Sequence, residues 1–302
     1  MEIDKFRGQI RENEPLGPHT SFGIGGPADY LIYPADRDDL AVLLTALSQR
    51  GLAFFVLGGG TNLLVRDKGF RGAATSLERL TAIRTVREYR SIGGAFAVVS
   101  AEAGAPLAKL VSWCAEEGLT GLEFAAGIPG TVGGAVCMNA GTAKGEIGDI
   151  TDSVTLLSPG GQFIMRGREE MGFGYRASSI PDEHVVVEAQ LVLRRDDKDR
   201  IKARIRELMA ARKERQPAGL PNAGSVFKNP QEHSAGKLIE EAGLKGKTVG
   251  GAQVSEKHAN FIVNRGAATA ADILALMELI QQTVLEVHGV RLEPEIRIIG
   301  ED

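Results

Sequence analysis

Clustered glycine is the feature that most constrains how this chain can fold. The sequence has 38 glycines among 302 residues, without a collagen-like period or a low-complexity tract. Glycine adopts left-handed backbone conformations and lets the backbone approach a ligand closely, so a group of glycines marks a tight turn or a binding loop. Glycine content alone leaves both interpretations open. The groups lie at residues 23–26, 58–60, 127–134, 160–161 and 250–251.

Composition and charge exclude several classes of protein. Hydrophobic residues make up 43% and charged residues 25%, as in ordinary globular proteins, and the length suffices for two or three domains. The net charge of −4 gives no reason to expect nucleic acid or a membrane as a partner. Two cysteines form no disulfide framework, and the charged beginning of the chain is no signal peptide, so we expect a cytoplasmic protein. The spacing of the histidines predicts no metal site, and no obligate protein partner is evident.

Hydrophobic periodicity predicts a mixture of helices and strands. Apolar residues recur at helical spacing, for example Leu40, Leu43, Leu44 and Leu47, whereas β-branched runs indicate strands. Such a mixture argues for α+β or α/β layers. The basic helix is expected to be a solvated connector between domains, because acidic residues are interspersed in it. The expected helices span 36–50, 105–117, 196–215, 234–242 and 269–288, and the expected strands span 53–57, 94–101, 185–193 and part of the C-terminal segment.

Two glycine-rich segments carry the strongest chemical signal. In residues 56–65 a hydrophobic strand runs into three glycines, then Thr61 and Asn62. Successive free backbone N–H groups in such a turn bind anions, and the two side chains add donors. Residues 126–141 form a second glycine-rich loop that leads into a small-residue helix. Together the two loops predict a site for a pyrophosphate.

Three shorter patterns do not complete a known signature. Residues 23–28 fit a loose GxGxxA pattern, but no hydrophobic strand precedes them and Pro27 stands where a helix should begin. Residues 246–248 match the end of a P-loop, but the earlier glycine that a P-loop requires is absent. Ser225 lacks the second glycine of a hydrolase elbow.

The two loops resemble the FAD-binding loops of the vanillyl-alcohol-oxidase-like superfamily. They are most similar to those of the UDP-N-acetylenolpyruvoylglucosamine reductase family, and the shortness of residues 206–290 favours its shorter type. Five further segments continue the resemblance in order along nearly the whole chain. They lie at residues 20–30, 174–178, 222–230, 250–264 and 293–295.

The resemblance implies a fold and a set of domains. The fold is α+β, with a two-part FAD-binding module of the PCMH type and a smaller C-terminal α+β substrate-binding domain. The expected division places residues 1–77 with 291–302 in the first FAD-binding subdomain, 78–205 in the second, and 206–290 in the substrate-binding domain.

The resemblance also implies an activity in peptidoglycan synthesis. FAD, bound without a covalent bond and reduced by NADPH, serves to reduce the enolpyruvyl group of UDP-N-acetylglucosamine enolpyruvate to the lactyl ether of UDP-N-acetylmuramate. The implied cofactor-binding residues are Gly58, Gly59, Gly60, Thr61, Asn62, Gly127, Pro129, Gly130, Thr131, Gly133, Gly134 and Asn139.

Three residues match the catalytic positions of the family. Arg176 and Glu295 are expected to face the charge that grows on the substrate carboxylate, with Glu295 protonated because burial raises its pKa. Ser225 is expected to donate the proton to the ether-bearing carbon. Tyr175, Lys228 and Asn229 are expected to bind substrate, although Tyr175 is equally explained as a core residue.

Each of these residues has a structural alternative, since most charged residues and serines are exposed and carry no chemistry. Their joint match to the family favours catalysis. Two other functions stay open: another FAD-dependent alcohol or hydroxy-acid oxidoreductase of the same superfamily, and a non-catalytic UDP-sugar-binding relative. The segments around Ser225 and Glu295 argue against the first, and the presence of all three catalytic residues argues against the second.

Overall fold

The chain divides into two compact units, each with its own hydrophobic core. The structure, a computed structural model, describes residues 1–301. The first unit comprises residues 1–12, 30–59 and 72–211, and the second comprises 13–29, 60–71 and 212–302. The boundary passes through β1 (Gln9–Pro15), β2 (Pro27–Tyr33) and β5 (Phe70–Ser76), and through α5 (Lys198–Arg215). The three-part division expected from the sequence stays a prediction.

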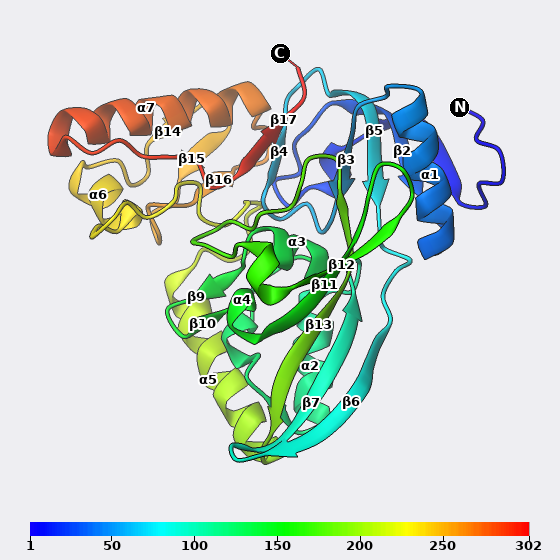
Figure 1. Ribbon diagram of the computed structural model, residues 1–302. Coiled ribbons are helices and arrows are strands. Elements are labelled where there is room, and N and C mark those ends of the chain that lie inside the picture. The colour runs from blue at the N-terminus through cyan, green and yellow to red at the C-terminus, as the bar shows by residue number, and fades with distance from the viewer. Residues whose placement is uncertain (302) are drawn as a thin grey trace. The chain divides into compact units, whose positions relative to one another are not determined.

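An antiparallel sheet forms the largest part of the first unit (Figure 1). Its strand order is β12-β11-β13-β7-β6, and β8 also pairs with β13. The central strand β13 is buried over most of its length, as its nearly continuous apolar sequence predicts. The edge strand β6 is charged and exposed, which discourages pairing with other chains. The strands are β6 (Ile83–Ser91), β7 (Gly94–Glu102), β8 (Leu119–Thr120), β11 (Thr151–Leu157), β12 (Phe163–Gly167) and β13 (Val185–Arg195).

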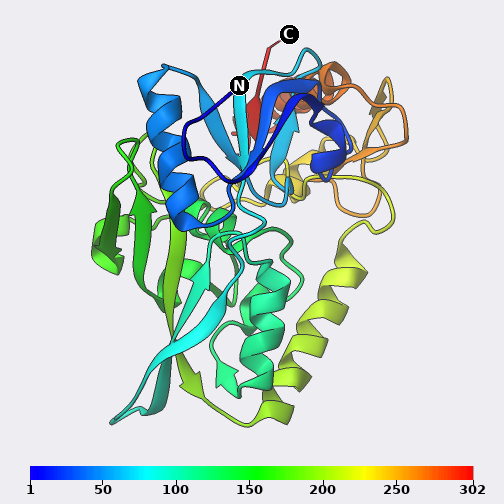
Figure 2. The same cartoon turned by 90° about the vertical axis from the view of Figure 1, so that its right-hand side faces the viewer.

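A second sheet has the order β1-β2-β5-β3, in which β3 (Phe54–Leu57) runs parallel to β5. Helix α1 (Arg37–Gln49) lies beside these strands (Figure 2). The side chain of Asp36 accepts a hydrogen bond from the N–H of Asp39 at the start of α1, and Gly51, with a φ of 60°, follows its end. The expected helix is therefore confirmed with both of its end signals.

Further helices and short strands complete the first unit, and α5 continues from it into the second. Helix α2 (Leu107–Glu116) buries the apolar face that its spacing predicts, and α5 is solvated, with Ile201 as its buried residue. The other elements are α3 (Val132–Cys137), α4 (Ile147–Ile150), β9 (Gly141–Thr142), β10 (Gly145–Glu146), and the 3-10 helices η2 (Glu123–Ala125) and η3 (Arg168–Met171).

The second unit combines a three-stranded sheet with α7 (Ala270–His288), which lies across it (Figure 1). Thr269 and Asp272 form a capping box at the start of this helix. The carboxylate of Asp67 accepts two more N–H groups there, from Ala270 at 2.8 Å and Ala271 at 3.0 Å. The remaining elements are η1 (Gly17–His19), β4 (Leu63–Val65), α6 (Ala235–Glu241), β14 (Thr248–Val249), β15 (Ala252–Val254), β16 (Ile262–Asn264) and β17 (Arg297–Ile299).

The helices and strands expected from hydrophobic periodicity are present within a few residues of their predicted ends. The segment 291–300 is strand only at β17, which pairs in parallel with β4. No helix within residues 1–301 is both long and apolar enough to span a bilayer.

Candidate active site

The first glycine loop requires glycine for steric reasons. Gly58 and Gly59 are exposed at the end of β3, whereas Gly60 is buried with a φ of 61°. A Cβ on Gly60 would lie 2.1 Å from the carbonyl oxygen of His19. The N–H of Ser21 donates to the Gly60 carbonyl at 3.0 Å. The conformation of the loop at Gly60 therefore depends on the 17–26 segment packed against it.

The two glycine-rich loops meet at Gly58. A Cβ on Gly58 would lie 2.9 Å from Oγ1 of Thr131, so the loops contact each other within the first unit. Gly127 and Gly130 have φ values of 76° and 111°, and together with exposed Pro129 and Gly134 they leave backbone at the surface. Exposed, closely spaced backbone of this kind fits a pyrophosphate.

Gly133 differs from its neighbours in the second loop. Its N–H donates to the carbonyl of Ala103 at 2.8 Å, and a Cβ there would lie 2.9 Å from the Cβ of Ala103. The N–H is therefore used inside the protein. Gly133 packs the loop against the segment that follows β7, and its predicted contact with the cofactor stays a prediction.

Asn62 connects the first loop to the segment that carries Glu295. Its Nδ2 donates to the main-chain carbonyl of Glu295 at 3.2 Å, and its own carbonyl accepts the N–H of Arg297 at 2.9 Å. The pairing of β4 with β17 continues this contact. Within the second unit, the end of the loop that includes Thr61 thus lies beside a predicted catalytic residue.

Asn139 holds the turn that carries Arg176. Its side chain is fully buried and its φ is 41°. Nδ2 donates to Glu146 at 2.7 Å and to the Gly174 carbonyl at 2.9 Å, while Oδ1 accepts the N–H of Gly148 at 2.8 Å. Both N–H groups are therefore used within the protein. The cofactor contact expected of Asn139 from the sequence stays a prediction.

Arg176 has an unfavourable backbone conformation. Gly174 and Ala177 exchange hydrogen bonds of 3.0 and 3.2 Å across a tight turn, and Arg176 is the second of its two central residues. Its φ is 56°, in the left-handed region where such turns normally carry glycine or asparagine. Its guanidinium lies 5.2 Å from the ring centre of Tyr175, which is 50% exposed and so is not a core residue. Strained backbone at an arginine is typical of functional sites.

Ser225 and Glu295 lie on neighbouring backbone segments of the second unit. The N–H of Glu295 donates to the Val226 carbonyl at 2.7 Å, and Phe227 forms a β-bridge with Pro294. Gly224, with a φ of 77°, precedes Ser225, and Glu295 is half-buried. The structure thus brings these two residues together, while Arg176 belongs to the first unit.

Two of the predicted substrate-binding residues, Lys228 and Asn229, come shortly after Ser225 in the sequence. The N–H of Lys228 donates to the Glu293 carbonyl at 2.9 Å, and its ammonium lies 3.8 Å from the Glu293 carboxylate. Oδ1 of Asn229 accepts the N–H of Ala235 at the start of α6, at 3.0 Å. Lys228 is therefore held near the Glu295 segment, and Asn229 contributes to the start of a helix.

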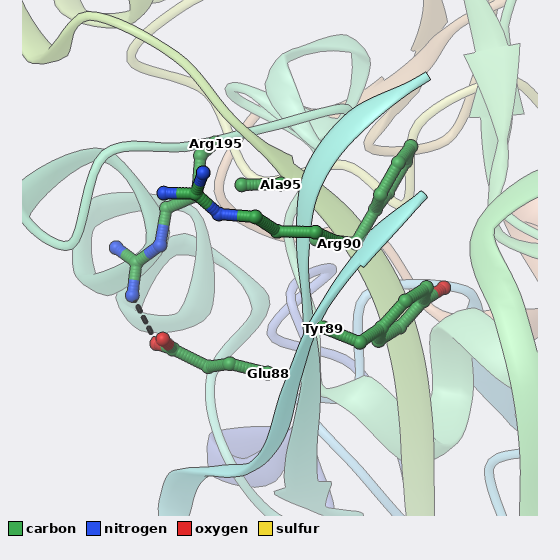
Figure 3. A pocket seen from close by; sticks show the side chains of 6 residues that line it. Glu88, Tyr89, Arg90, Ala95 and Arg195 are labelled. Carbon is green, nitrogen blue, oxygen red and sulfur yellow. Dashed lines mark hydrogen bonds and ion pairs between the residues drawn. The ribbon is translucent and has the colours of Figure 1, made fainter. Parts of the chain in front are cut away.

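A surface pocket of the first unit contains none of these residues. Its volume is about 370 Å³, and it lies on the β6–β7 hairpin (Figure 3). Arg195 forms an ion pair with Glu88 there, and Tyr89 stacks on Phe96 at 5.5 Å. Among residues 1–301, no group of three or more His, Cys, Asp or Glu side chains is placed to hold a metal ion.

One residue of the Ser225 neighbourhood was given no role in the sequence analysis, although its segment, 250–264, is part of the family resemblance. Asn260 is buried, and its side chain contacts the backbone of Phe227. A single asparagine in the segment KHANF gives no periodicity or spacing from which such a contact can be inferred.

Comparison with known proteins gives matches over most of the chain. Residues 28–165 match the FAD binding domain family, and residues 216–299 match the C-terminal domain of UDP-N-acetylenolpyruvoylglucosamine reductase. The reductase of Caldanaerobacter subterraneus subsp. tengcongensis is 45% identical, with 99% of this chain and 98% of that protein covered. The reductase of Geobacter sulfurreducens is also 45% identical, over 99% of this chain and 96% of that protein.

A solved structure supports the same relationship. The reductase of Thermus caldophilus superposes with a TM-score of 0.80 at 38% identity, covering 97% of this chain and 98% of that one. The expected α+β fold with an FAD-binding module is thereby confirmed, and FAD is the cofactor. The chain belongs to the UDP-N-acetylenolpyruvoylglucosamine reductase family of FAD-dependent oxidoreductases.

Proposed function

We propose that this protein reduces UDP-N-acetylglucosamine enolpyruvate to UDP-N-acetylmuramate in the cytoplasm, for peptidoglycan synthesis, with NADPH as the hydride donor. The observation that supports the proposal is that the segments carrying Ser225 and Glu295 are neighbours, joined by the 2.7 Å hydrogen bond from the N–H of Glu295 to the Val226 carbonyl. The proposed reaction requires a hydroxyl and a carboxyl group near one another, and neighbouring segments supply these two residue types.

FAD supplies hydride to the terminal carbon of the enolpyruvyl double bond. We assign its pyrophosphate to the glycine backbone around Gly58, Gly59, Gly127 and Gly134, which are exposed, and Gly130, which is half-buried. Non-covalent binding of the FAD is proposed on the resemblance to the reductase family.

Arg176 and Glu295 stabilise the negative charge that the added hydride pushes onto the substrate carboxylate. The guanidinium of Arg176 offers a fixed pair of donors to the carboxylate oxygens. Glu295 is assigned the role of a neutral carboxyl group whose O–H donates a hydrogen bond to this charge. Donors placed where charge develops lower the barrier more than donors that bind the ground state.

Ser225 donates the proton from its Oγ to the ether-bearing carbon, and solvent then reprotonates Oγ. A hydroxyl is a weak acid, but the enol-like carbon is strongly basic, so position matters more than acidity. Gly224 before it has no heavy atom within 4 Å of a built Cβ, so the backbone there leaves room for a substrate. Lys228 and Tyr175 are assigned to the substrate, with the ammonium of Lys228 directed to the diphosphate.

The test is Ser225→Ala, measured in the two half-reactions separately by stopped flow. Flavin reduction by NADPH should keep its rate, while flavin re-oxidation by the enolpyruvyl substrate should slow by about 10²–10⁴, the usual value of a positioned proton donor. Ser234→Ala is the matched control, because Ser234 caps α6 through a bond to Lys237 and so tests stability alone. Equal slowing of both half-reactions in the Ser225 variant would make Ser225 a structural residue.

A further inference from the structure

The backbone around Ser225 is held by a residue that the proposed mechanism does not use. We propose that Asn260 is a positioning residue for proton transfer, because its side-chain amide fixes the segment that begins with Ser225. The inference rests on the proposed function, since it assigns Asn260 to the step in which Ser225 donates its proton.

Asn260 makes three hydrogen bonds to two consecutive residues after Ser225. Its Oδ1 accepts the N–H of Phe227 at 3.0 Å, and its Nδ2 donates to the carbonyl of the same residue at 2.8 Å. Its main-chain carbonyl accepts the N–H of Val226 at 2.8 Å. The orientation of the amide is determined by these partners, because one is a donor and the other an acceptor.

The opposite edge of the same segment contacts the Glu295 region. The Val226 carbonyl accepts the N–H of Glu295, and the N–H of Lys228 donates to the Glu293 carbonyl. Residues 225–228 thus lie between the Asn260 segment on one side and residues 293–295 on the other. Any shift of this segment changes the position of Ser225 relative to Glu295.

On its other side, Ser225 follows a glycine that gives little restraint. Gly224 has a φ of 77°, open space where a side chain would stand, and one hydrogen bond, from its N–H to Oδ1 of Asn222 at 3.1 Å. Ser225 itself forms a β-bridge with Phe261, the residue that follows Asn260, so its position is set by this bridge together with Val226 and Phe227. Val226 and Phe227 are the residues that Asn260 holds.

The side-chain amide of Asn260 takes the place of a neighbouring strand as hydrogen-bond partner for the backbone N–H and carbonyl of Phe227. Phe227 is 1% exposed and Asn260 is 3% exposed, so water cannot replace the bonds between them. Removing the amide leaves a buried N–H and a buried carbonyl without partners, and the segment must move to satisfy them. A displacement of about 1 Å at a reacting group can cost about 10²-fold in rate.

Asn260→Asp tests the proposal through pH. The ionised carboxylate introduced by this substitution keeps the acceptor for the Phe227 N–H but sets a second anionic oxygen against the Phe227 carbonyl. Burial and that carbonyl raise the pKa of the introduced acid. Below this pKa the neutral acid donates from O–H and restores the lost bond, so activity should recover on acidification.

The measurement is substrate-driven flavin re-oxidation from about pH 5 to about pH 9, the range in which a buried carboxyl group titrates. At the alkaline end, the Asn260→Asp variant should be slower than the wild type by about 10- to 100-fold, and the difference should shrink toward low pH. Asn260→Ala should be slow across the whole range. Flavin reduction by NADPH should be unchanged in both variants.

Other titrating groups face this region and are present in every variant. His258 lies on the same segment and accepts the Asn260 N–H at 3.2 Å, with its pKa lowered by burial. Lys245 and Glu240 act on His258, while Glu293, paired with Lys228, and Glu295 lie on the neighbouring segment. The ratio of variant to wild-type rate at each pH removes their contribution.

Asn264→Asp is the matched control. Asn264 is also buried in the second unit, but its amide bonds to the Phe22 carbonyl and to the 266–268 turn. This variant should lose thermal stability without a pH-dependent defect confined to re-oxidation. FAD content and Tm are measured for every variant, and Asn260→Ala supplies the result if the Asn260→Asp variant does not fold.

Three outcomes separate the possibilities. A defect confined to re-oxidation, with recovery of the Asn260→Asp variant at low pH, supports the proposal. Equal slowing of both half-reactions, or a lowered Tm with an unchanged re-oxidation rate, overturns it and leaves the proposed function intact. If the wild-type protein itself is not re-oxidised by the enolpyruvyl substrate, the proposed function fails and the role of Asn260 fails with it.

Discussion

Because the backbone at Arg176 is strained, we expect replacement by glycine to have opposite effects on stability and on activity. Its φ of 56° costs an L-residue about 1–2 kcal/mol, a cost that glycine does not carry. Glycine in turn loses about 0.4–1 kcal/mol through the greater freedom of the unfolded chain. Arg176→Gly should therefore be more stable than Arg176→Ala by about 0.5–1 kcal/mol, or about 1–4 °C in Tm for a unit of this size.

The comparison of these two variants isolates the backbone term. Both lose the guanidinium and its contact with Tyr175, so that loss cancels between them. Tm is measured by calorimetry at one FAD concentration, since bound ligand shifts the apparent stability. Both variants should slow substrate-driven flavin re-oxidation by about 10²–10³, the usual value of one donor placed at a developing charge.

Two results would refute this reasoning. If the Gly variant unfolds at a lower temperature than the Ala variant, by the equivalent of about 0.4–1 kcal/mol, the left-handed conformation carries no strain. If Arg176→Gly is more stable and also keeps its re-oxidation rate, Arg176 is not catalytic. We expect Arg176→Gly to be more stable than Arg176→Ala and to re-oxidise its flavin more slowly than the wild type. Such a trade-off is found where a strained residue is retained for function.

Further predictions concern other residues and the cofactor. Glu295→Gln, which keeps a donor, should retain more single-turnover re-oxidation activity than Glu295→Asp, and an equally inactive Gln variant would indicate an ionised base instead. Asn139→Asp should lower the free energy of unfolding by about 2–3 kcal/mol and slow re-oxidation, because the introduced carboxylate faces the Gly174 carbonyl. Asn139→Gly should lower the free energy of unfolding by less, because glycine accepts the φ of 41°. Asp67→Ala should lower the free energy of unfolding in urea by about 1–2 kcal/mol, through the lost cap of α7, without changing the flavin spectrum. The N–H groups of Thr269 and Gly251 lower the pKa of Asp272 below its usual value of 3.8. The ionised carboxylate therefore stabilises the fold above pH 3.8, and this stabilisation is lost as the pH falls further. Asp272→Asn should abolish this pH dependence of the free energy of unfolding, as measured by acid titration. Acid precipitation of the purified protein should release all of the flavin as FAD, and flavin retained in the pellet would contradict non-covalent binding.

Local signals were sufficient for the elements with strong patterns. The leucines of α1, with Asp36 before them and Gly51 after them, determine a helix with marked ends, since the same residues supply the buried face and both caps. The apolar run of β13 likewise predicts a central strand. The edge strand β6 was not predicted, because its charged sequence takes the extended conformation only through pairing with β7.

For the candidate active site too, some features could be inferred from the sequence and others could not. The glycine loops and the positions of Arg176, Ser225 and Glu295 are read from the sequence, because glycine patterns and their order along the chain resemble a family. The sequence did not reveal that Gly133 packs on Ala103, or that the amide of Asn139 is used by the Gly174 turn. Packing distances of this kind depend on segments that are far apart in the chain.

What the sequence by itself determined was the set of local conformations and the chemical groups available at each position. Only the tertiary structure decided which groups meet. Asn62 and Glu295 are 233 residues apart and share a hydrogen bond, and Asn260 reaches Phe227 across 33 residues. Contacts of that range carry no period and no fixed spacing, because they form only when burial of each core brings separate segments together and their buried polar groups must find partners.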